Sequence, residues 1–261
     1  MIILIHTSKT MRPPAENTID RLSTPVLIEK ARELSVYAKT LTLADIHKTM
    51  HVSETLAVTT KNLLESWTDQ PASQRAAIDS FLGDIYSGLQ VSALTDDDRS
   101  YANEHMRILS GLYGIVRPLD GVYPYRFEMG YRFPDLPGKN LYAFWGDTIA
   151  KTLPENEAIV DLSAVEYGKT VTKYVDPARI ISPRFLTISQ KTLQPIFVVV
   201  HAKIARGAFA HWMIKHRVEA VEQLPTFREL GYVYDAGLST SAVPVFVCQE
   251  FGGIGLSVRL S

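Results

Sequence analysis

Glycine is absent before Gly83 in this chain of 261 residues, and eight of its fifteen glycines fall between Gly83 and Gly146. The glycine-free part repeats apolar residues at three- and four-residue spacing, which is typical of helices that bury one face. We therefore predict helices at residues 25–39, 43–50, 54–67 and 72–81, with Thr42 and Ser53 as N-caps. The glycine-rich middle third is expected to form loops whose backbone can approach a ligand closely.

The rest of the chain alternates predicted strands and helices. Residues 2–5 are an apolar run that predicts a buried strand, and Thr95 with three following aspartates predicts a helix that runs to about Ser110, with Gly111 as its stop. Further predictions are a helix at 140–153, strands at 159–162, 180–188 and 195–201, a helix at 204–217, and a hairpin of 232–234 with 245–248. This order predicts a mixed α and β fold of the α/β class, with a central sheet. Residues 1–250 are expected to form a single compact domain and residues 251–261 a loosely ordered tail.

The composition limits the classes of protein to which this chain can belong. With 46% hydrophobic residues the chain can bury a sizeable core without metals or disulfides, and its single cysteine, Cys248, can form no internal disulfide and no CxxC pair. A reducing, cytoplasmic setting is expected. The first residues are apolar only briefly and no window approaches eighteen apolar residues, so we predict neither secretion nor a membrane span. A monomer is favoured.

Charge is distributed unevenly along the chain. The formal net charge is −1, yet residues 1–100 carry 10 basic and 13 acidic side chains, whereas residues 165–217 carry nine basic side chains against Glu166 and Asp176. The second stretch is a candidate anion-binding surface. The alternative is an ordinary solvated surface.

Two short motifs indicate neither a nucleotide loop nor a metal site. Ser8-Lys9-Thr10 after the first strand lacks the glycines of a P-loop, although Lys9 remains a cation at the carboxyl end of a strand, where ligands commonly bind. His47 and His51 have HxxxH spacing, but Lys48 replaces the glutamate of a metalloprotease and no third ligand is evident. We predict no metal and no cofactor.

Residues 109–115 combine two glycines with apolar neighbours directly after a predicted helix. A helix-hairpin-helix module offers backbone N–H groups to DNA phosphates in this way, here from Gly111, Leu112, Tyr113 and Gly114. The alternative is a glycine C-cap followed by a turn, and Pro118 delays any second helix because it keeps Arg117 out of the α region.

The predicted helix near residue 203 has a basic face with small residues at its centre. Lys203, Arg206, Gly207 and Ala210 share this face, so a phosphate could approach the helix while the two cations neutralise it. Alternatively, the small residues make room for a packed neighbour and the cations are solvated.

Acidic and hydroxyl groups follow a predicted strand at residues 161–167. Ser163 and Glu166 in this segment, together with Asp147 after Trp145-Gly146, are candidates for acid–base catalysis. They are equally suited to cap helices and to pair with nearby arginines.

Ordered blocks in the middle of the chain resemble the signatures of the peroxide stress protein YaaA family. The resemblance continues through Leu162-Ser163-Ala164-Val165-Glu166-Tyr167 and Ala202-Lys203-Ile204-Ala205-Arg206-Gly207 to residues 231–235. The four central blocks are Phe81-Leu82-Gly83-Asp84-Ile85-Tyr86-Ser87-Gly88-Leu89, Arg107-Ile108-Leu109-Ser110-Gly111-Leu112-Tyr113-Gly114-Ile115-Val116-Arg117-Pro118-Leu119-Asp120, Pro124-Tyr125-Arg126-Phe127-Glu128-Met129-Gly130 and Leu141-Tyr142-Ala143-Phe144-Trp145-Gly146-Asp147. Two positions depart from the family pattern: its Ser-Pro-Ala-Lys-Thr is His6-Thr7-Ser8-Lys9-Thr10 here, and the second lysine of its Ala-Lys-Lys-Ala-Arg-Gly block is Ile204.

The resemblance implies a cytoplasmic protein that protects cells from hydrogen peroxide, with a single α/β domain, a helix-hairpin-helix-like element and a positively charged cleft for duplex DNA. On this basis we expect sequence-independent binding of the phosphate backbone by Lys203, Arg206 and the amides of residues 111–114. Lys9, Arg117 and Arg126 are expected to line the same cleft. The alternative hypothesis is an enzyme that acts on DNA or a nucleotide beside this cleft, with Glu166, Ser163 or Asp147 transferring protons.

Overall fold

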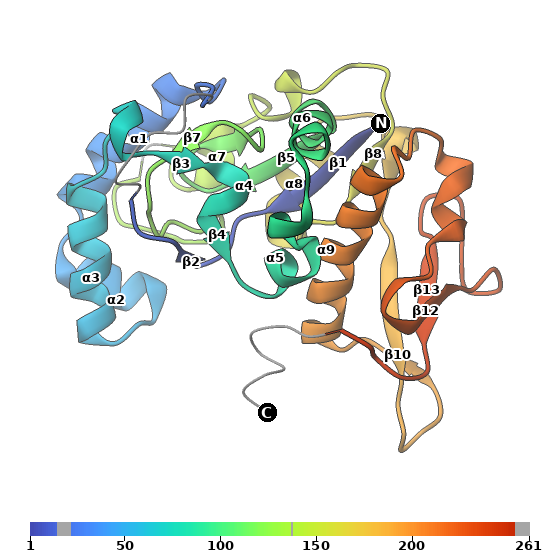
Figure 1. Ribbon diagram of the computed structural model, residues 1–261. Coiled ribbons are helices and arrows are strands. Elements are labelled where there is room, and N and C mark those ends of the chain that lie inside the picture. The colour runs from blue at the N-terminus through green and yellow to red at the C-terminus, as the bar shows by residue number, and fades with distance from the viewer. Residues whose placement is uncertain (15–21, 137, 254–261) are drawn as a thin grey trace.

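A computed structural model describes residues 1–14, 22–136 and 138–253, and its centre is a five-stranded sheet (Figure 1). The strand order is β6-β5-β1-β8-β9, in which β6 alone runs antiparallel to its neighbour. The strands are β1 (Ile2–His6), β5 (Met106–Ser110), β6 (Gly114–Val116), β8 (Ile159–Asp161) and β9 (Ile180–Ile181). The first four residues of β1 are buried, as expected of a strand covered on both faces, which confirms the predicted strand and the mixed α and β class.

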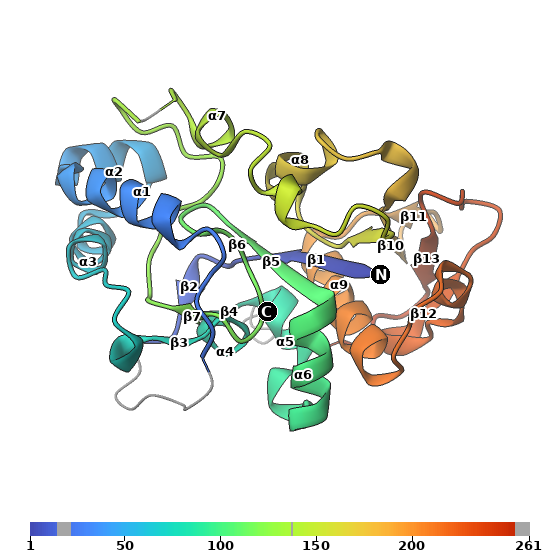
Figure 2. The ribbon, with the colours of Figure 1, turned by 90° about the horizontal axis from the view of Figure 1, so that it is seen from above.

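Helices cover both faces of this sheet: α8 lies on one face, and α5, α6 and α9 lie on the other (Figure 2). In chain order, the α-helices are α1 (Ile28–Thr40), α2 (Leu43–Met50), α3 (Glu54–Glu65), α4 (Ala77–Ser80), α5 (Asp84–Leu89), α6 (Asp96–His105), α7 (Leu141–Trp145), α8 (Val165–Thr172) and α9 (Val199–Lys215). Short 3₁₀ turns occur at Pro71–Ser73, Val91–Ala93, Ala150–Thr152, Pro177–Arg179, Val221–Thr226 and Glu229–Gly231.

The first three predicted helices are confirmed, and α2 and α3 begin where a side chain caps the helix. The Thr42 hydroxyl accepts from the Asp45 N–H and the Asp45 carboxylate accepts from the Thr42 N–H, which makes a capping box at the start of α2. Ser53 caps α3 by accepting from the Leu56 N–H.

A second sheet packs against α9 and has the strand order β11-β10-β13-β12. Phe209 of α9 lies 5.6 Å from the ring of Phe185 and 5.3 Å from that of Phe246, so aromatic side chains join the helix to this sheet. Tyr234 pairs with Phe246 in antiparallel register, which confirms the predicted hairpin. The strands are β10 (Arg184–Ile188), β11 (Pro195–Ile196), β12 (Tyr232–Tyr234) and β13 (Val245–Cys248), and two small ladders pair β2 (Thr10–Met11) with β4 (Phe81–Leu82) and β3 (Arg75–Ala76) with β7 (Gly121–Val122).

Helices α5 and α9 cross with their backbones in contact. A Cβ atom on Gly207 would lie 1.8 Å from the Ile85 carbonyl oxygen, and one on Gly88 would lie 1.9 Å from the Ile204 carbonyl oxygen. Gly207 therefore admits a neighbouring helix, and the prediction that it lets a phosphate approach is wrong.

The predicted helix-hairpin-helix element is also wrong. Helix α6 ends at His105, and residues 106–110 form β5 because their apolar side chains are needed beside β1 in the core. Gly111 is thus no helix stop. Residues 111–114 form the turn of the β5–β6 hairpin, in which Ser110 pairs with Gly114.

Other helices and strands have boundaries that differ from the predicted ones, because tertiary contacts override the local sequence pattern. Residues 72–81 form short pieces of strand and helix, and the helix predicted at 140–153 ends at Trp145, where Gly146 takes φ +51° and ψ −130°. The apolar run at 195–201 contains only the two-residue β11 before α9 begins at Val199, and residues 180–188 divide between two sheets.

Residues 254–261 of the predicted tail lie outside the described residues, whereas Phe251 stacks on His201 with 4.0 Å between ring centroids. The single-domain boundary at residue 250 stays a prediction. Within the described ranges, no helix combines the length and apolar character that crossing a bilayer requires.

Candidate functional site

The candidate site lies at the carboxyl edge of the parallel strands. Strand β1 has β5 on one side and β8 on the other. The strands that follow β1 in the sequence are therefore added first on one side of it and then on the other, which makes β1 the switch point of the sheet. Ligands of open α/β sheets commonly bind at such switch points. Here the edge brings together residues 6–9 at the end of β1, Ser110 at the end of β5 and residues 161–163 at the end of β8.

His6 is the central side chain of this edge. Its Nδ1 accepts the Ala164 N–H at 3.2 Å, and its ring stacks on Tyr167 at a centroid distance of 5.0 Å. Burial, with smaller effects from Arg206 and Lys203, lowers the pKa of His6 to about 3. His6 is therefore neutral at physiological pH. Arg206 and Lys203 lie close enough to His6 for their charges to disfavour its protonated form.

A chain of hydroxyl groups leads from Thr7, the neighbour of His6, to a carboxyl group. Thr7 donates to the Tyr167 hydroxyl at 3.3 Å, and the Tyr167 hydroxyl donates to Glu128 Oε1 at 3.1 Å. Burial raises the pKa of Glu128, while Lys9 and the Tyr167 hydrogen bond oppose that shift. A carboxyl group with a raised pKa that lines a pocket is suited to proton transfer.

Lys9, Lys203 and Arg206 are the cations of this edge. The first two are exposed, whereas Arg206 is half-buried, and burial lowers the pKa of its guanidinium although the Asp161 carboxylate partly offsets this. In the described part of the chain, none of the three side chains has an ion pair or a hydrogen bond. Arg126, also half-buried, donates to the Lys9 carbonyl at 3.2 Å. The structure therefore brings four of the predicted cations together.

Asp161 is held by Ser163, one of the predicted catalytic residues. The Ser163 N–H and hydroxyl donate to Asp161 Oδ1 at 2.9 and 2.6 Å, and burial raises the pKa of Asp161. A Cβ atom on Gly168 would lie 2.6 Å from Asp161 Oδ2, so a glycine is needed beside the carboxylate. Ser163 thus orients a buried acid in the geometry of an Asx turn.

Glu166 lies at the site but is already bonded, and Asp147 is paired with Lys151. Glu166 Oε1 accepts the Gly130 N–H at 2.7 Å, which ties α8 to the loop that follows Glu128. Asp147 is exposed and forms an ion pair with Lys151 at 2.8 Å. Among the described contacts, none links Asp147 to the groups at the carboxyl edge, so its place beside them stays a prediction.

The predicted phosphate-binding turn is closed to a ligand. Gly111, Leu112, Tyr113 and Gly114 are all buried. A Cβ atom on Gly111 would lie 2.1 Å from the Phe127 carbonyl oxygen, and the Trp145 indole N–H donates to the Gly111 carbonyl at 3.1 Å. The amides of this turn therefore face the protein interior, which corrects the prediction that they bind DNA.

Arg117 is also misplaced in the sequence-based prediction. Because β6 runs antiparallel to β5, its last residue pairs with Ile108 and the chain returns toward the amino edge of the sheet. Arg117 there forms an ion pair with the buried Asp120 at 3.2 Å. It therefore does not join the cations at the opposite edge, which corrects its predicted place beside Lys9 and Arg126.

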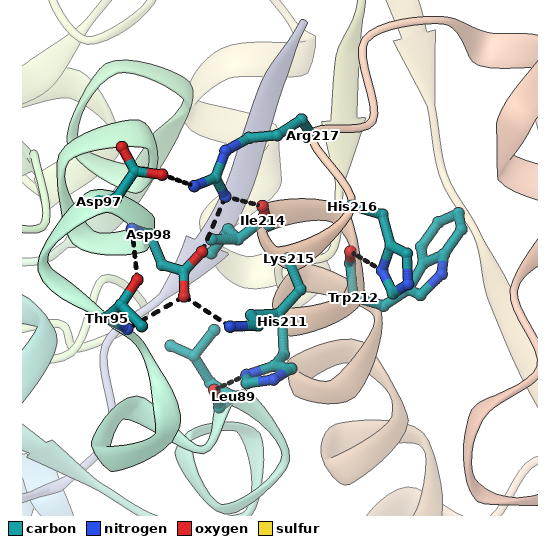
Figure 3. A network of polar contacts seen from close by, with 10 residues as sticks. All are labelled: Leu89, Thr95, Asp97, Asp98, His211, Trp212, Ile214, Lys215, His216 and Arg217. Carbon is teal, nitrogen blue, oxygen red and sulfur yellow. Dashed lines mark hydrogen bonds and ion pairs between the residues drawn. The ribbon is translucent and has the colours of Figure 1, made fainter.

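Some of the basic side chains in residues 165–217 are paired with other groups of the same chain. Lys215 forms an ion pair with Asp98 at 2.7 Å, and Arg217 forms ion pairs with Asp98 at 2.9 Å and with Asp97 (Figure 3). Arg179 donates to the Glu157 carbonyl at 2.9 Å. These three cations have structural partners, unlike Lys203 and Arg206.

A pocket of about 480 Å³ opens beside the carboxyl edge. Its lining residues come from the segment after β1, from α2 and its C-cap, from the loop after β7 and from α8: Lys9, Lys48, Thr49, His51, Glu128, Gly130, Tyr131, Arg132 and Glu166. In the described ranges no three His, Cys, Asp or Glu side chains gather closely enough to hold a metal ion.

Sequence reasoning missed His6 and Glu128 as site residues. The position of His6 after an apolar strand was a usable signal, since Lys9 was singled out for that reason. Glu128 gave no such signal, because its role depends on burial and on Tyr167, a residue 39 positions away.

Comparisons with known proteins agree on one family. The family model described as peroxide stress protein YaaA matches residues 1–238. A UPF0246 protein of Salinispora tropica is 55% identical over 259 residues, covering 99% of this chain and 98% of the relative. A UPF0246 protein of Marinomonas sp. strain MWYL1 is 38% identical over 256 residues, covering 96% and 98%.

Proposed function

The chain belongs to the peroxide stress protein YaaA family, and we propose that it acts in this stress response by binding double-stranded DNA along the phosphate backbone. The observation that carries the proposal is the group of cations at the carboxyl edge, Lys9, Lys203 and Arg206, whose charges have no ion-pair partner within the described residues. Such cations attract phosphates. Binding to chromosomal DNA requires the protein to be in the cytoplasm.

The arrangement favours backbone contact over base readout. Arg206 can bond a phosphate with two parallel N–H groups, while Lys9 and Lys203 act as exposed point charges. The amides of residues 111–114 take no part because they are buried. Contacts of this kind position a protein on DNA without reading its sequence.

Fluorescence anisotropy of a labelled duplex at several salt concentrations tests the proposal. With roughly three to four phosphates neutralised, log K should fall against log salt with a slope of about −3. The Lys203→Ala/Arg206→Ala variant should bind about thirtyfold more weakly, since it loses two contacts of ~1 kcal/mol each, and its slope should be shallower by about 2.

The matched control is Lys151→Ala/Lys191→Ala, which also removes two positive charges but lies outside the carboxyl edge. It should keep its affinity within about twofold. Equal losses in both variants would show that net charge alone drives binding, and a slope near zero for the wild type would contradict phosphate contact altogether.

A second candidate function, catalysis on DNA or a nucleotide, is favoured by Glu128. Its raised pKa, its hydrogen bond from Tyr167 and its place in the pocket suit a general acid or base. Glu128 is better placed for this role than Glu166, whose carboxylate accepts a backbone N–H.

The Glu128→Gln variant separates catalysis from binding. A catalytic Glu128 predicts normal DNA affinity but lost survival of peroxide-treated cells that carry the variant as their only copy. The exposed Glu104 supplies the control Glu104→Gln, which should protect as the wild type does. Full protection by Glu128→Gln would eliminate the catalytic candidate and leave DNA binding as the function.

A further inference from the structure

The pocket beside the carboxyl edge has the dimensions and the lining of a small-molecule site. Its volume of about 480 Å³ lies within the roughly 300–1,000 Å³ common for ligand pockets. Lys9 and Glu128 belong both to this pocket and to the edge described above, so a ligand in the pocket would be continuous with DNA bound at that edge.

Tyr131 gives the pocket an aromatic wall. Its ring packs edge-on against Phe133, with 5.6 Å between ring centroids, which fixes its orientation. Its hydroxyl is buried close to the Arg126 guanidinium but has no hydrogen bond of good geometry within the described residues, and the Arg126 Nε atom also has none. Buried polar atoms without a partner are rare, and because Tyr131 lines the pocket whereas Arg126 does not, the Tyr131 hydroxyl is the atom to which a bound ligand would supply a partner.

Cations and hydrogen-bonding groups complete the lining. Lys9, Lys48 and Arg132 are exposed at the pocket and have no ion pair in the described part of the chain. Glu128 offers a carboxyl group inside. A flat ring, a carboxyl group and a cationic rim match the base and the phosphate of a nucleotide, because a base stacks and forms hydrogen bonds while its phosphate needs positive charge.

We propose that this pocket binds one nucleotide, extruded from the bound DNA, with its base against Tyr131 and its phosphate between Lys9 and Lys48. The inference rests on the proposed DNA binding. Proteins that extrude a base must separate it from its neighbours, which costs least where the base is already unpaired. The protein should therefore take up a base that faces an abasic site in preference to a paired one.

Photo-crosslinking with 5-iodouracil tests this placement, because the excited base couples to an aromatic ring on which it stacks. The probe is a duplex with 5-iodouracil either opposite an abasic site or paired with adenine, and the crosslinked peptide is identified by mass spectrometry. We expect the crosslink on Tyr131, at least fivefold more with the unpaired base. It should be lost in Tyr131→Leu.

Control variants keep the result interpretable. Tyr174→Leu removes an exposed tyrosine on another surface and should leave the crosslink unchanged. Lys48→Glu, an exposed change at the rim, should reduce crosslinking at least fivefold in a protein whose thermal unfolding is unaltered. A crosslink that survives Lys48→Glu, or that forms on Tyr174 instead, would overturn the proposal.

Anisotropy of the same duplexes distinguishes the two proposals. If DNA binds and no crosslink forms on Tyr131, the nucleotide pocket is wrong and phosphate-backbone binding stands. If no DNA binds, the mononucleotide 5-iodo-dUMP provides a second arm. A crosslink from 5-iodo-dUMP to Tyr131 would then support a pocket for free nucleotides, and its absence would overturn the pocket as a nucleotide site.

Discussion

Lys203 and Arg206 in the first half of α9 face the carboxyl edge without ion pairs in the described chain, whereas Lys215 and Arg217 at its other end are bound by Asp98 (Figure 3). Asp98 also accepts the Thr95 N–H in the capping box of α6, and the Lys215 hydrogen bond is the main cause that lowers its pKa. The same residue types are thus free to bind a ligand at one end and join two helices at the other.

The difference between the two ends of α9 cannot be predicted by counting the charges in the sequence. All four cations fall within one basic stretch of the sequence, and the residue that separates them, Asp98, lies 117 positions before Lys215. A basic run becomes a binding surface only where its cations form no ion pair. Arg206 is close enough to the Asp161 carboxylate to be affected by its charge, but the two form no ion pair in the described chain.

The largest expected effect comes from the glycine between the two ends. Gly207→Ala should lower the free energy of unfolding by about 3 kcal/mol, because the new Cβ would overlap the backbone of α5. Urea denaturation measures this, with Gly237→Ala as the control, since a Cβ there meets only an ordinary contact at 3.4 Å. Unchanged stability with lost DNA binding would instead restore Gly207 to the phosphate-binding face.

A smaller effect is expected at the carboxyl end of α9. Asp98→Ala removes the carboxylate half of the α6 capping box and leaves Lys215 and Arg217 without this partner, so the free energy of unfolding should fall by about 2 kcal/mol while DNA affinity stays within about twofold. Asp147→Ala breaks an exposed ion pair and should change stability by less than about 0.5 kcal/mol. Weaker DNA binding by Asp98→Ala would break the distinction between the two ends.

An effect of similar size distinguishes the two ends of α9 by their pH dependence. The pKa of His6 is about 3 in the folded protein and near 6.5 when unfolded, so only the unfolded chain binds the proton between these values. Stability should therefore fall as pH drops below about 6.5. Because the pKa of Asp98 is lowered, the contribution of Asp98 stays complete down to about pH 4 and is lost only below it.

Urea denaturation at pH 7 and pH 5 tests this contrast. The wild type should lose about 2 kcal/mol more between these pH values than His6→Gln does, because the unfolded chain takes up almost one more proton than the folded protein over most of this range. Asp98→Asn should show the wild-type difference over the same range. Identical losses in the wild type and His6→Gln would mean that His6 does not titrate as its surroundings imply.

Sequence reasoning succeeded where the determinants are local. Thr42, Ser53 and Thr95 cap helices through residues three positions ahead, so their helices were predictable. It failed at residues 109–115, where the two glycines fit a helix stop as well as a hairpin turn. Only the pairing of β5 with β1 decides between them.

The candidate site was predictable in part for the same reason. Lys9, Ser163 and Glu166 follow predicted strands, and parallel strands bring their carboxyl ends to one edge. Gly207 shares a helix face with Lys203 and Arg206, as a residue that faces a ligand would. Nothing in the local sequence shows that α5 packs against this glycine. The role of Glu128 depends on its burial, which is a property of the assembled fold.

The contact of α5 with α9 restricts how this sequence can change over evolution. Each missing side chain at Gly88 and Gly207 leaves room for a carbonyl oxygen of the other helix, and no mutation makes a carbonyl smaller. A substitution at either glycine therefore has no compensating substitution at the other. Arg206 directly precedes Gly207, so any mutation that moved α9 away from α5 would also move the Arg206 guanidinium away from His6. The helix contact and the cationic edge are therefore retained or lost together.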